Sequence, residues 1–178
     1  MEVVNARCAG LDVHKKLVVA CALTPDVVTA DGQPKPVLER FGTMTEDLQA
    51  LGRWLAERGV VQVAMESTGV YWQPIWNILE EHGGFELLLV NAHHIKAVPG
   101  RKTDMQDSQW GSTLHMHGLL RAGFVPPADI RRLQDYLRLR ADHVGQAGSC
   151  VQLMQKALER MNVKLHDAIS SLAGASGM

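Results

Sequence analysis

The stretch CAGLDVHKKLVVACAL, residues 8–23, decides how this chain begins to fold. Its two apolar runs, CAGLDV and KKLVVACAL, are rich in small and β-branched residues and are joined by a short polar link, which predicts a β-hairpin. Asp12 lies in the middle or at the end of the first run, inside an otherwise apolar frame. A carboxylate in such a place makes Asp12 the first candidate for a functional side chain.

The segments after the hairpin alternate between strand and helix patterns. Short apolar runs predict strands, whereas apolar residues spaced three and four apart predict helices. Thr45 is expected to cap the first helix and Gly59 to end it, and Gly83 is expected to end the second. Thr103 and Gln106 stand at capping-box spacing in the third. The predicted strands are residues 36–43, 60–67 and 85–91, and the predicted helices are residues 43–59, 70–84 and 103–120.

The order of these elements predicts the topology of a single sheet. Short links join the first three strands, so we expect those strands to be antiparallel. The last two strands each follow a helical crossover, so we expect them to be parallel. The sequence therefore predicts an α/β fold with a mixed five-stranded sheet and flanking helices, which is the ribonuclease H-like arrangement.

The pattern changes at Pro126 and Pro127, which predict a boundary between a domain of residues 1–125 and a segment of residues 126–178. Apolar residues then recur at heptad spacing, which predicts a long coiled-coil helix over residues 130–172. We favour pairing with a second copy of the chain over packing onto its own domain, because the apolar seam is longer than that domain would cover. The two seam positions read Leu137, Val144, Val151, Leu158, Leu165, Leu172 and Leu133, Arg140, Ala147, Met154, Met161, Ala168.

Four carboxylates occupy the places where this fold would gather them. Asp12 and Glu66 lie at strand ends, and Asp104 and Asp107 share one face near the start of the last predicted helix. Clustered carboxylates repel one another and are tolerated mainly when a divalent cation neutralises them. Carboxylate oxygens suit Mg²⁺ or Mn²⁺, and two such ions serve both ends of a phosphodiester displacement. We therefore predict a catalytic metal site in which Asp12 is the bridging ligand.

Each acid also has a purely structural explanation. Asp12 suits a turn at the end of a strand, and Glu66 is able to cap the helix that follows it. Asp104 and Asp107 complement the positive end of a helix dipole. The metal site is the better interpretation because all four acids fall together at the positions where this fold would build one.

The composition excludes several classes of protein. No apolar run in the 178 residues approaches the roughly 20 residues that span a bilayer, and the N-terminus lacks the features of a signal peptide. Cys8, Cys21 and Cys150 are widely spaced and odd in number, which is typical of reduced thiols. We therefore expect a cytoplasmic protein.

The net charge of −1 conceals an uneven distribution of charge. Residues 121–164 hold eight basic and four acidic residues, which suits contact with a nucleic-acid backbone but equally suits a solvated helix face. Other basic residues flank the proposed metal site, where they would contact phosphates but would equally suit an ordinary solvent-exposed surface. The expected nucleic-acid contacts are Lys15, Lys16, Arg101 and Lys102 beside the acids, and Arg131, Arg132, Arg138 and Arg140 in the basic segment.

Three sequence blocks, GLDVHK (residues 10–15), ESTGVYW (66–72) and KTDMQDS (102–108), resemble the motifs of the DEDD transposases of bacterial insertion sequences, the group that includes the Piv-type DNA invertases. The N-terminal domain of that family is similar to the Holliday-junction resolvase RuvC. The resemblance implies metal-dependent DNA cleavage and strand exchange in transposition, assembly through a coiled coil and, in several members, guidance by an RNA from the element. It assigns the metal positions to Asp12, Glu66, Asp104 and Asp107.

Two features depart from that family. Ser108 stands where the family often has alanine. Family members also continue into a C-terminal transposase domain with a serine proposed as the DNA nucleophile, whereas this sequence stops at residue 178. We interpret the sequence as an N-terminal fragment or a truncated reading frame. No serine here receives the nucleophile role, and independent recombination by this chain is not expected.

Three functions are open at this point. The first is the catalytic domain of an insertion-sequence transposase, and the second is a stand-alone RuvC-like nuclease that cuts branched DNA. The third is a non-catalytic oligomerisation module whose acids only cap helices and face solvent. A sugar-kinase-type ATPase shares the sheet order, but it requires glycine-rich phosphate loops that the sequence lacks, and it ranks last.

Overall fold

The computed structural model describes residues 2–67, 69–91, 107–164, 169 and 172–174, and it describes Asp107 by its backbone alone. The chain divides into two compact units, Met1–Val125 and Pro126–Met178. None of the described helices combines the length and the apolar character needed to span a bilayer.

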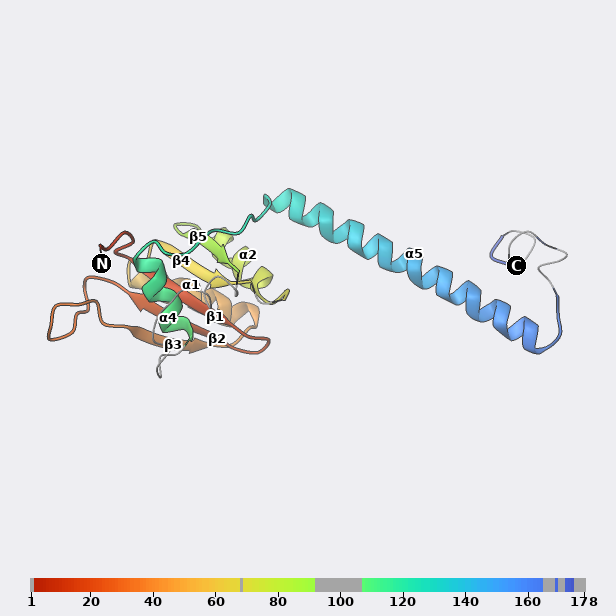
Figure 1. Cartoon of the computed structure of the whole chain (residues 1–178), viewed down its shortest axis with the longest axis horizontal. Coiled ribbons are helices and arrows are strands. Elements are labelled where there is room, and N and C mark those ends of the chain that lie inside the picture. The colour runs from red at the N-terminus through yellow and green to blue at the C-terminus, as the bar shows by residue number, and fades with distance from the viewer. Residues whose placement is uncertain (1, 68, 92–106, 165–168, 170–171, 175–178) are drawn as a thin grey trace. The chain divides into compact units, whose positions relative to one another are not determined.

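The first unit is built on a five-stranded sheet in the order β3-β2-β1-β4-β5 (Figure 1). β1 is antiparallel to β2, which is antiparallel to β3, whereas β4 runs parallel to both β1 and β5. The predicted mixed sheet is therefore confirmed, and its strand order and directions are those of the ribonuclease H-like fold. The strands are β1 (Cys8–Val13), β2 (Val18–Leu23), β3 (Val37–Phe41), β4 (Gln62–Glu66) and β5 (Glu86–Val90).

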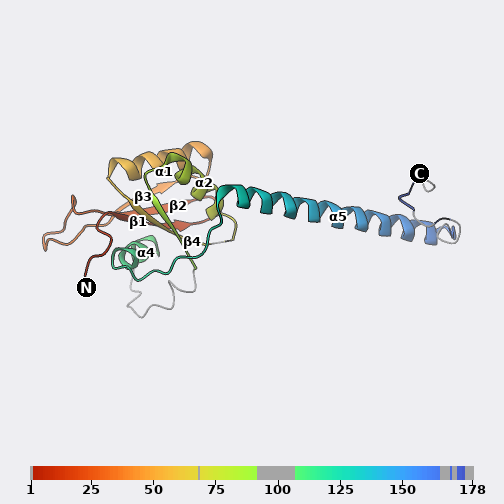
Figure 2. The same cartoon turned by 90° about the horizontal axis from the view of Figure 1, so that it is seen from above.

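Helices cover both faces of this sheet. α1 (Thr45–Glu57) and α2 (Trp72–His82) lie on one face, and α4 (Asp107–Met116) lies on the other (Figure 2). The main core forms under α1 and α2, where alternate residues of β1 meet the leucines of both helices. The remaining residues of β1 face α4, because successive side chains of a strand point to opposite sides of the sheet.

The helix ends agree with the sequence in part. Gly59 and Gly83 follow α1 and α2 with φ angles of 64° and 73°, so both predicted stops are confirmed. The prediction that Thr45 caps α1 is wrong, because Thr45 is already the first helical residue and Met44 is the cap. The backbone N–H of Met44 instead donates to the Asp47 carboxylate at 3.3 Å. The predicted capping box of Thr103 and Gln106 lies outside the described residues.

α4 approaches β1 closely at Gly10. A Cβ atom at Gly10 would lie 2.6 Å from the Ser112 backbone nitrogen and 2.8 Å from the Ser108 carbonyl oxygen. The Ser112 hydroxyl joins the helix to the sheet, because it lies 2.8 Å from the carbonyl oxygen of Cys21 on β2. Glycine at position 10 therefore sets the depth at which α4 lies on the sheet.

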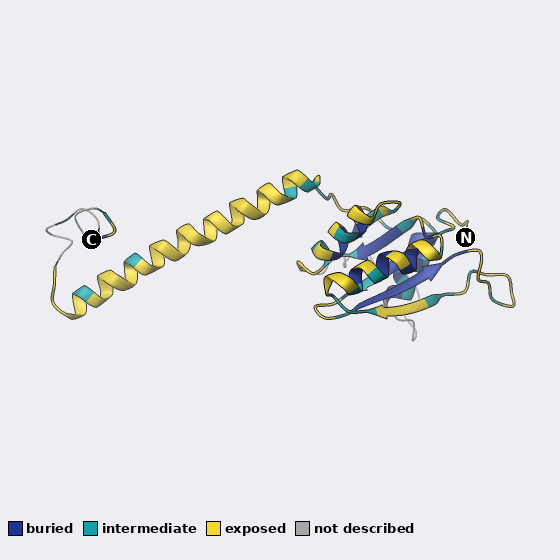
Figure 3. Ribbon diagram, turned by 180° about the vertical axis from the view of Figure 1, so that it is seen from behind, coloured by how far each residue is buried: buried dark blue, intermediate teal, exposed yellow. Residues whose placement is uncertain are grey.

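The second unit contains one long helix, α5 (Ala128–Arg160), none of whose residues is buried (Figure 3). Its seam residues Leu133, Leu137 and Val144 are between 53% and 60% exposed. The prediction that the helix continues to residue 172 is wrong. Met161 is the C-cap and Asn162 takes a left-handed conformation with φ 56°, which ends a helix.

We expect Gly10→Ala to destabilise the first unit by about 2 kcal/mol, because the new methyl group meets helix backbone and α4 must move. Gly111→Ala is the matched control on α4, since its Cβ meets no described atom within 4 Å and alanine favours a helix. Thermal unfolding followed by circular dichroism compares the two variants. Equal stability of Gly10→Ala and wild type would contradict the close approach.

Candidate metal centre

The register of the parallel pair β1 and β4 brings two predicted acids side by side. Leu11 pairs with Met65, so the next positions along the two strands are Asp12 and Glu66. Neighbouring strands lie about 4.8 Å apart, and residues at the same level of a parallel pair point to the same face. Leu11 and Met65 face the core under α1 and α2. Asp12 and Glu66 therefore face the side of the sheet that carries α4.

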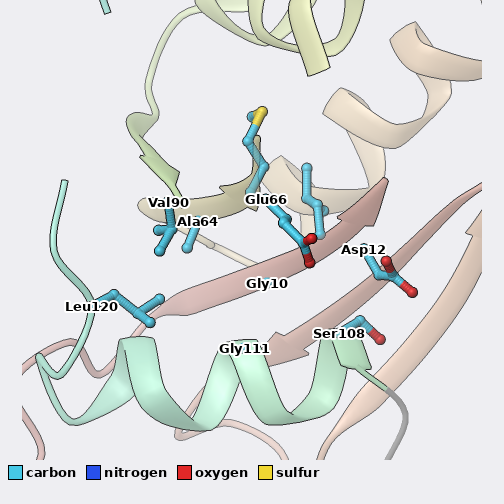
Figure 4. Close-up of a pocket in the computed structure, with 10 residues that line it drawn as sticks. Gly10, Asp12, Ala64, Glu66, Val90, Ser108, Gly111 and Leu120 are labelled. Atoms are coloured by element: carbon cyan, nitrogen blue, oxygen red, sulfur yellow. The ribbon is translucent and has the colours of Figure 1, made fainter. Parts of the chain in front are cut away.

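Asp12 and Glu66 line a pocket between the sheet and the beginning of α4 (Figure 4). The side chain of Asp12 is only 18% exposed, so its carboxylate is largely withdrawn from bulk water. Ser108, the second residue of α4, lines the same pocket and is 2% exposed. The other lining residues are small or apolar: Gly10, Leu11, Ala64, Met65, Val90, Gly111 and Leu120.

His14 contacts the carboxylate of Asp12. Its Nε2 atom lies 3.1 Å from Asp12 Oδ2, and because a carboxylate only accepts hydrogen bonds, Nε2 carries the proton. The imidazole is 57% exposed at the rim of the site. The contact holds one carboxylate oxygen of Asp12 in a fixed direction and leaves the other for a second partner.

The two remaining predicted acids are described less fully. Asp104 lies outside the described residues. Asp107 is the first residue of α4, directly before Ser108, and its side chain also lies outside the description. Among the residues that the structure describes, no group of three His, Cys, Asp or Glu side chains is close enough to hold a metal ion. The described part of the site is thus the pair Asp12 and Glu66.

The donor atoms of this pair fit a hard divalent cation. Mg²⁺ in proteins commonly uses one or two carboxylates and completes its octahedral shell with water and substrate phosphate oxygens. Cys8, which faces α4 from β1, is a poor metal ligand, because burial and the neighbouring Cys21 raise the pKa of its thiol to about 12. The chemistry of the pocket therefore favours Mg²⁺ or Mn²⁺ over a thiophilic metal such as zinc.

Two predicted basic residues follow Asp12 in the link between β1 and β2. Lys15 and Lys16 are exposed in the tight link between β1 and β2, which is closed by a hydrogen bond from the His14 N–H to the Leu17 carbonyl oxygen at 2.9 Å. Arg101 and Lys102 lie outside the described residues.

The arginines of α5 differ in their surroundings. Arg131 is half-buried, and its Nη1 atom donates to the Pro126 carbonyl oxygen at 2.7 Å. Arg138 pairs with Asp135 at 3.2 Å on the exposed surface of the helix. Arg132 and Arg140 are exposed as well. Three of the four predicted arginines thus have side chains open to solvent.

The domain is of the ribonuclease H-like class, and it has two carboxylates at the ends of the adjacent strands β1 and β4. Residues 9–163 match the model of the IS110-type DEDD family, whose description is transposase. The chain belongs to this transposase family, and the predicted resemblance is confirmed. No curated protein matches the sequence.

Three solved structures are similar to parts of the chain. Thermus thermophilus RuvC aligns over 67% of this chain and 84% of its own, with 14% identity and a TM-score of 0.41. A fowlpox virus resolvase, solved with its substrate Holliday junction DNA, aligns over 63% of this chain and 99% of its own, with 12% identity and a TM-score of 0.44. An Aquifex aeolicus member of the Ppx/GppA family covers 50% of this chain and 36% of its own, with 11% identity and a TM-score of 0.35.

The stability of the first unit should depend on the protonation of His115 on α4. His115 is 5% exposed, and burial lowers the pKa of its imidazole below the ordinary value. The unfolded chain therefore binds the proton more readily, so stability is complete above the ordinary pKa of about 6.5 and is lost as the pH falls below it. We expect the melting temperature of wild type to fall more between pH 7.5 and 5.5 than that of His115→Gln.

His82→Gln is the control, because His82 is exposed and belongs to the same unit. It should keep the pH dependence of wild type. Equal losses of melting temperature in wild type and His115→Gln would contradict the assignment of the effect to His115.

Proposed function

We propose that the first unit is the catalytic domain of a DNA transposase that cleaves and exchanges DNA strands with the help of Mg²⁺ or Mn²⁺. The observation that carries this proposal is the side-by-side placement of Asp12 and Glu66 in one pocket, on neighbouring parallel strands. Two carboxylates so close together repel each other, and a divalent cation removes that repulsion. Membership of the transposase family supports DNA as the substrate.

In this proposal, four carboxylates hold the cations and His14 orients one of them. Asp12 is the central ligand, with its direction fixed by His14, and Glu66 binds from the neighbouring strand. Asp104 and Asp107 complete the set from the region where α4 begins. When bound, the divalent cations neutralise charge on the transferring phosphoryl group and activate the attacking oxygen. The small residues Gly10, Ala64 and Gly111 line the pocket next to Asp12 and Glu66.

The basic residues are proposed to hold nucleic acid on the enzyme. Lys15, Lys16, Arg101 and Lys102 would contact DNA phosphates near the acids, and the solvent-exposed arginines of α5 would contact DNA or an element-encoded guide RNA. Such contacts fix the position of a strand without reading its sequence. We place this activity in the bacterial cytoplasm.

We also propose that α5 associates with α5 of a second copy of the chain. The observation that supports this is a helix of 33 residues in which the apolar seam is exposed, including Leu137 and Val144. An isolated amphipathic helix in water gains most of its stability by burying its apolar face. Pairing of two such helices buries the seam of each.

The metal site is tested by calorimetric titration of Mn²⁺ into the chain, with and without a short DNA duplex. We expect Asp12→Asn and Glu66→Gln each to weaken Mn²⁺ binding by at least about tenfold, because each removes a charged ligand from the same site. Glu57→Gln is the control, since Glu57 is an exposed acid at the end of α1, on the opposite face of the sheet. Mn²⁺ binding by both site variants at wild-type strength would show that these carboxylates hold no metal.

The association through α5 is tested by sedimentation equilibrium over a range of protein concentrations. Leu137→Glu puts a charge into the seam and should shift the chain towards monomer, whereas Leu139→Glu changes the same residue type on the opposite side of the helix and should not. Both leucines are more than half exposed, so neither change disturbs a buried core. A monomeric wild type, or equal behaviour of the two variants, would rule out the proposed pairing.

A further inference from the structure

Ser108 lines the metal pocket, and its hydroxyl is buried without a hydrogen-bond partner among the described residues. Ser108 is 2% exposed, so its hydroxyl does not reach bulk water either. A hydroxyl that is removed from water and left unpaired costs free energy, and nearly all buried polar groups in proteins have a partner. The unpaired state of this hydroxyl therefore requires an explanation.

Two other hydroxyls of α4 are satisfied in the ordinary way. Ser112 Oγ lies 2.7 Å from the carbonyl oxygen of Ser108, one turn earlier, and Thr113 Oγ1 donates to the carbonyl oxygen of Gln109 at 2.9 Å. Ser and Thr commonly form this bond to the carbonyl four residues before them in a helix. Ser108 is the second described residue of α4, so the described part of the helix holds no carbonyl four residues before it.

The surroundings of Ser108 point to a partner that binds in the pocket. Figure 4 shows Ser108 at the start of α4, and Ser108 lines the same pocket as Asp12 and Glu66. The rest of the described lining is glycine, alanine and larger apolar residues, which offer no side-chain acceptor. The close contact of α4 with Gly10 holds the backbone of Ser108 against β1 before anything binds.

We propose that Ser108 is a positioning residue whose hydroxyl donates a hydrogen bond to an oxygen atom carried by the divalent cation of this site. The inference rests on the proposed metal site. Bound Mg²⁺ keeps several waters and takes up phosphate oxygens, so the acceptor is a metal-bound water or a phosphate oxygen. Hydrogen bonds from the surrounding protein orient such ligands, and their loss commonly weakens metal affinity about 10-fold or more.

This role predicts opposite effects of one substitution on stability and on binding. Ser108→Ala removes an unpaired buried hydroxyl, so without metal it should raise the melting temperature by about 2 °C. The same variant should bind Mn²⁺ about tenfold more weakly. Ser112→Ala is the matched control, because it removes a buried but hydrogen-bonded hydroxyl from the same helix. It should lower the melting temperature and leave Mn²⁺ affinity unchanged.

Calorimetry with Mn²⁺ alone and with Mn²⁺ plus a DNA duplex, together with metal-free melting curves, tests the inference. Weaker binding by Ser108→Ala with Mn²⁺ alone identifies water as the acceptor, and weaker binding only with DNA identifies a phosphate oxygen. Wild-type affinity in both titrations, or a lowered melting temperature of Ser108→Ala, overturns the role of Ser108 while the metal site stands. Absence of Mn²⁺ binding by wild type in both titrations instead removes the metal site itself, and the inference with it.

Discussion

The contact between α4 and β1 at Gly10 is the constraint on which the candidate site depends. Only a residue without a Cβ atom allows the backbone of Ser112 and Ser108 to come so near the strand. Asp12 lies two residues further along β1 on the same face, so the beginning of α4 is held beside its carboxylate. The helix is thereby part of the site as well as part of the fold. Any change that lifts α4 from β1 alters the pocket before it unfolds the unit.

The site contains two energetically unfavourable features that the fold alone does not explain. Asp12 and Glu66 place two negative charges on adjacent strands, and Ser108 holds a buried hydroxyl with no described partner. A buried hydroxyl without a partner lowers stability, and like charges placed close together repel each other. A bound cation would compensate both at once, since it neutralises the carboxylates and its oxygen ligands accept a hydrogen bond from the hydroxyl. Destabilising features gathered in one pocket are typical of a functional site.

The sheet and two of the acids could be predicted because they depend on local pattern and connection length. Adjacent strands joined by a short link must be antiparallel, whereas strands joined by a helical crossover can be parallel. These rules put the carboxyl ends of β1 and β4 next to each other. Asp12 and Glu66 lie at the same level because of the register between β1 and β4. A shift of that register by one residue would turn Glu66 to the opposite face of the sheet. Ser108 was noted only as a departure from the family, because its burial depends on a helix–strand contact between distant positions. The end of α5 was missed because the heptad pattern continues past Asn162, whose left-handed backbone stops the helix.

The central claim is that Asp12 and Glu66 hold a divalent cation. Its most direct test is a crystal structure of the chain with Mn²⁺, using the anomalous scattering of the metal to locate it. We predict a peak within about 2.2 Å of carboxylate oxygens of both Asp12 and Glu66, next to the start of α4. Well-ordered Asp12 and Glu66 side chains with no anomalous peak between them, at a Mn²⁺ concentration that saturates binding in solution, would contradict the account.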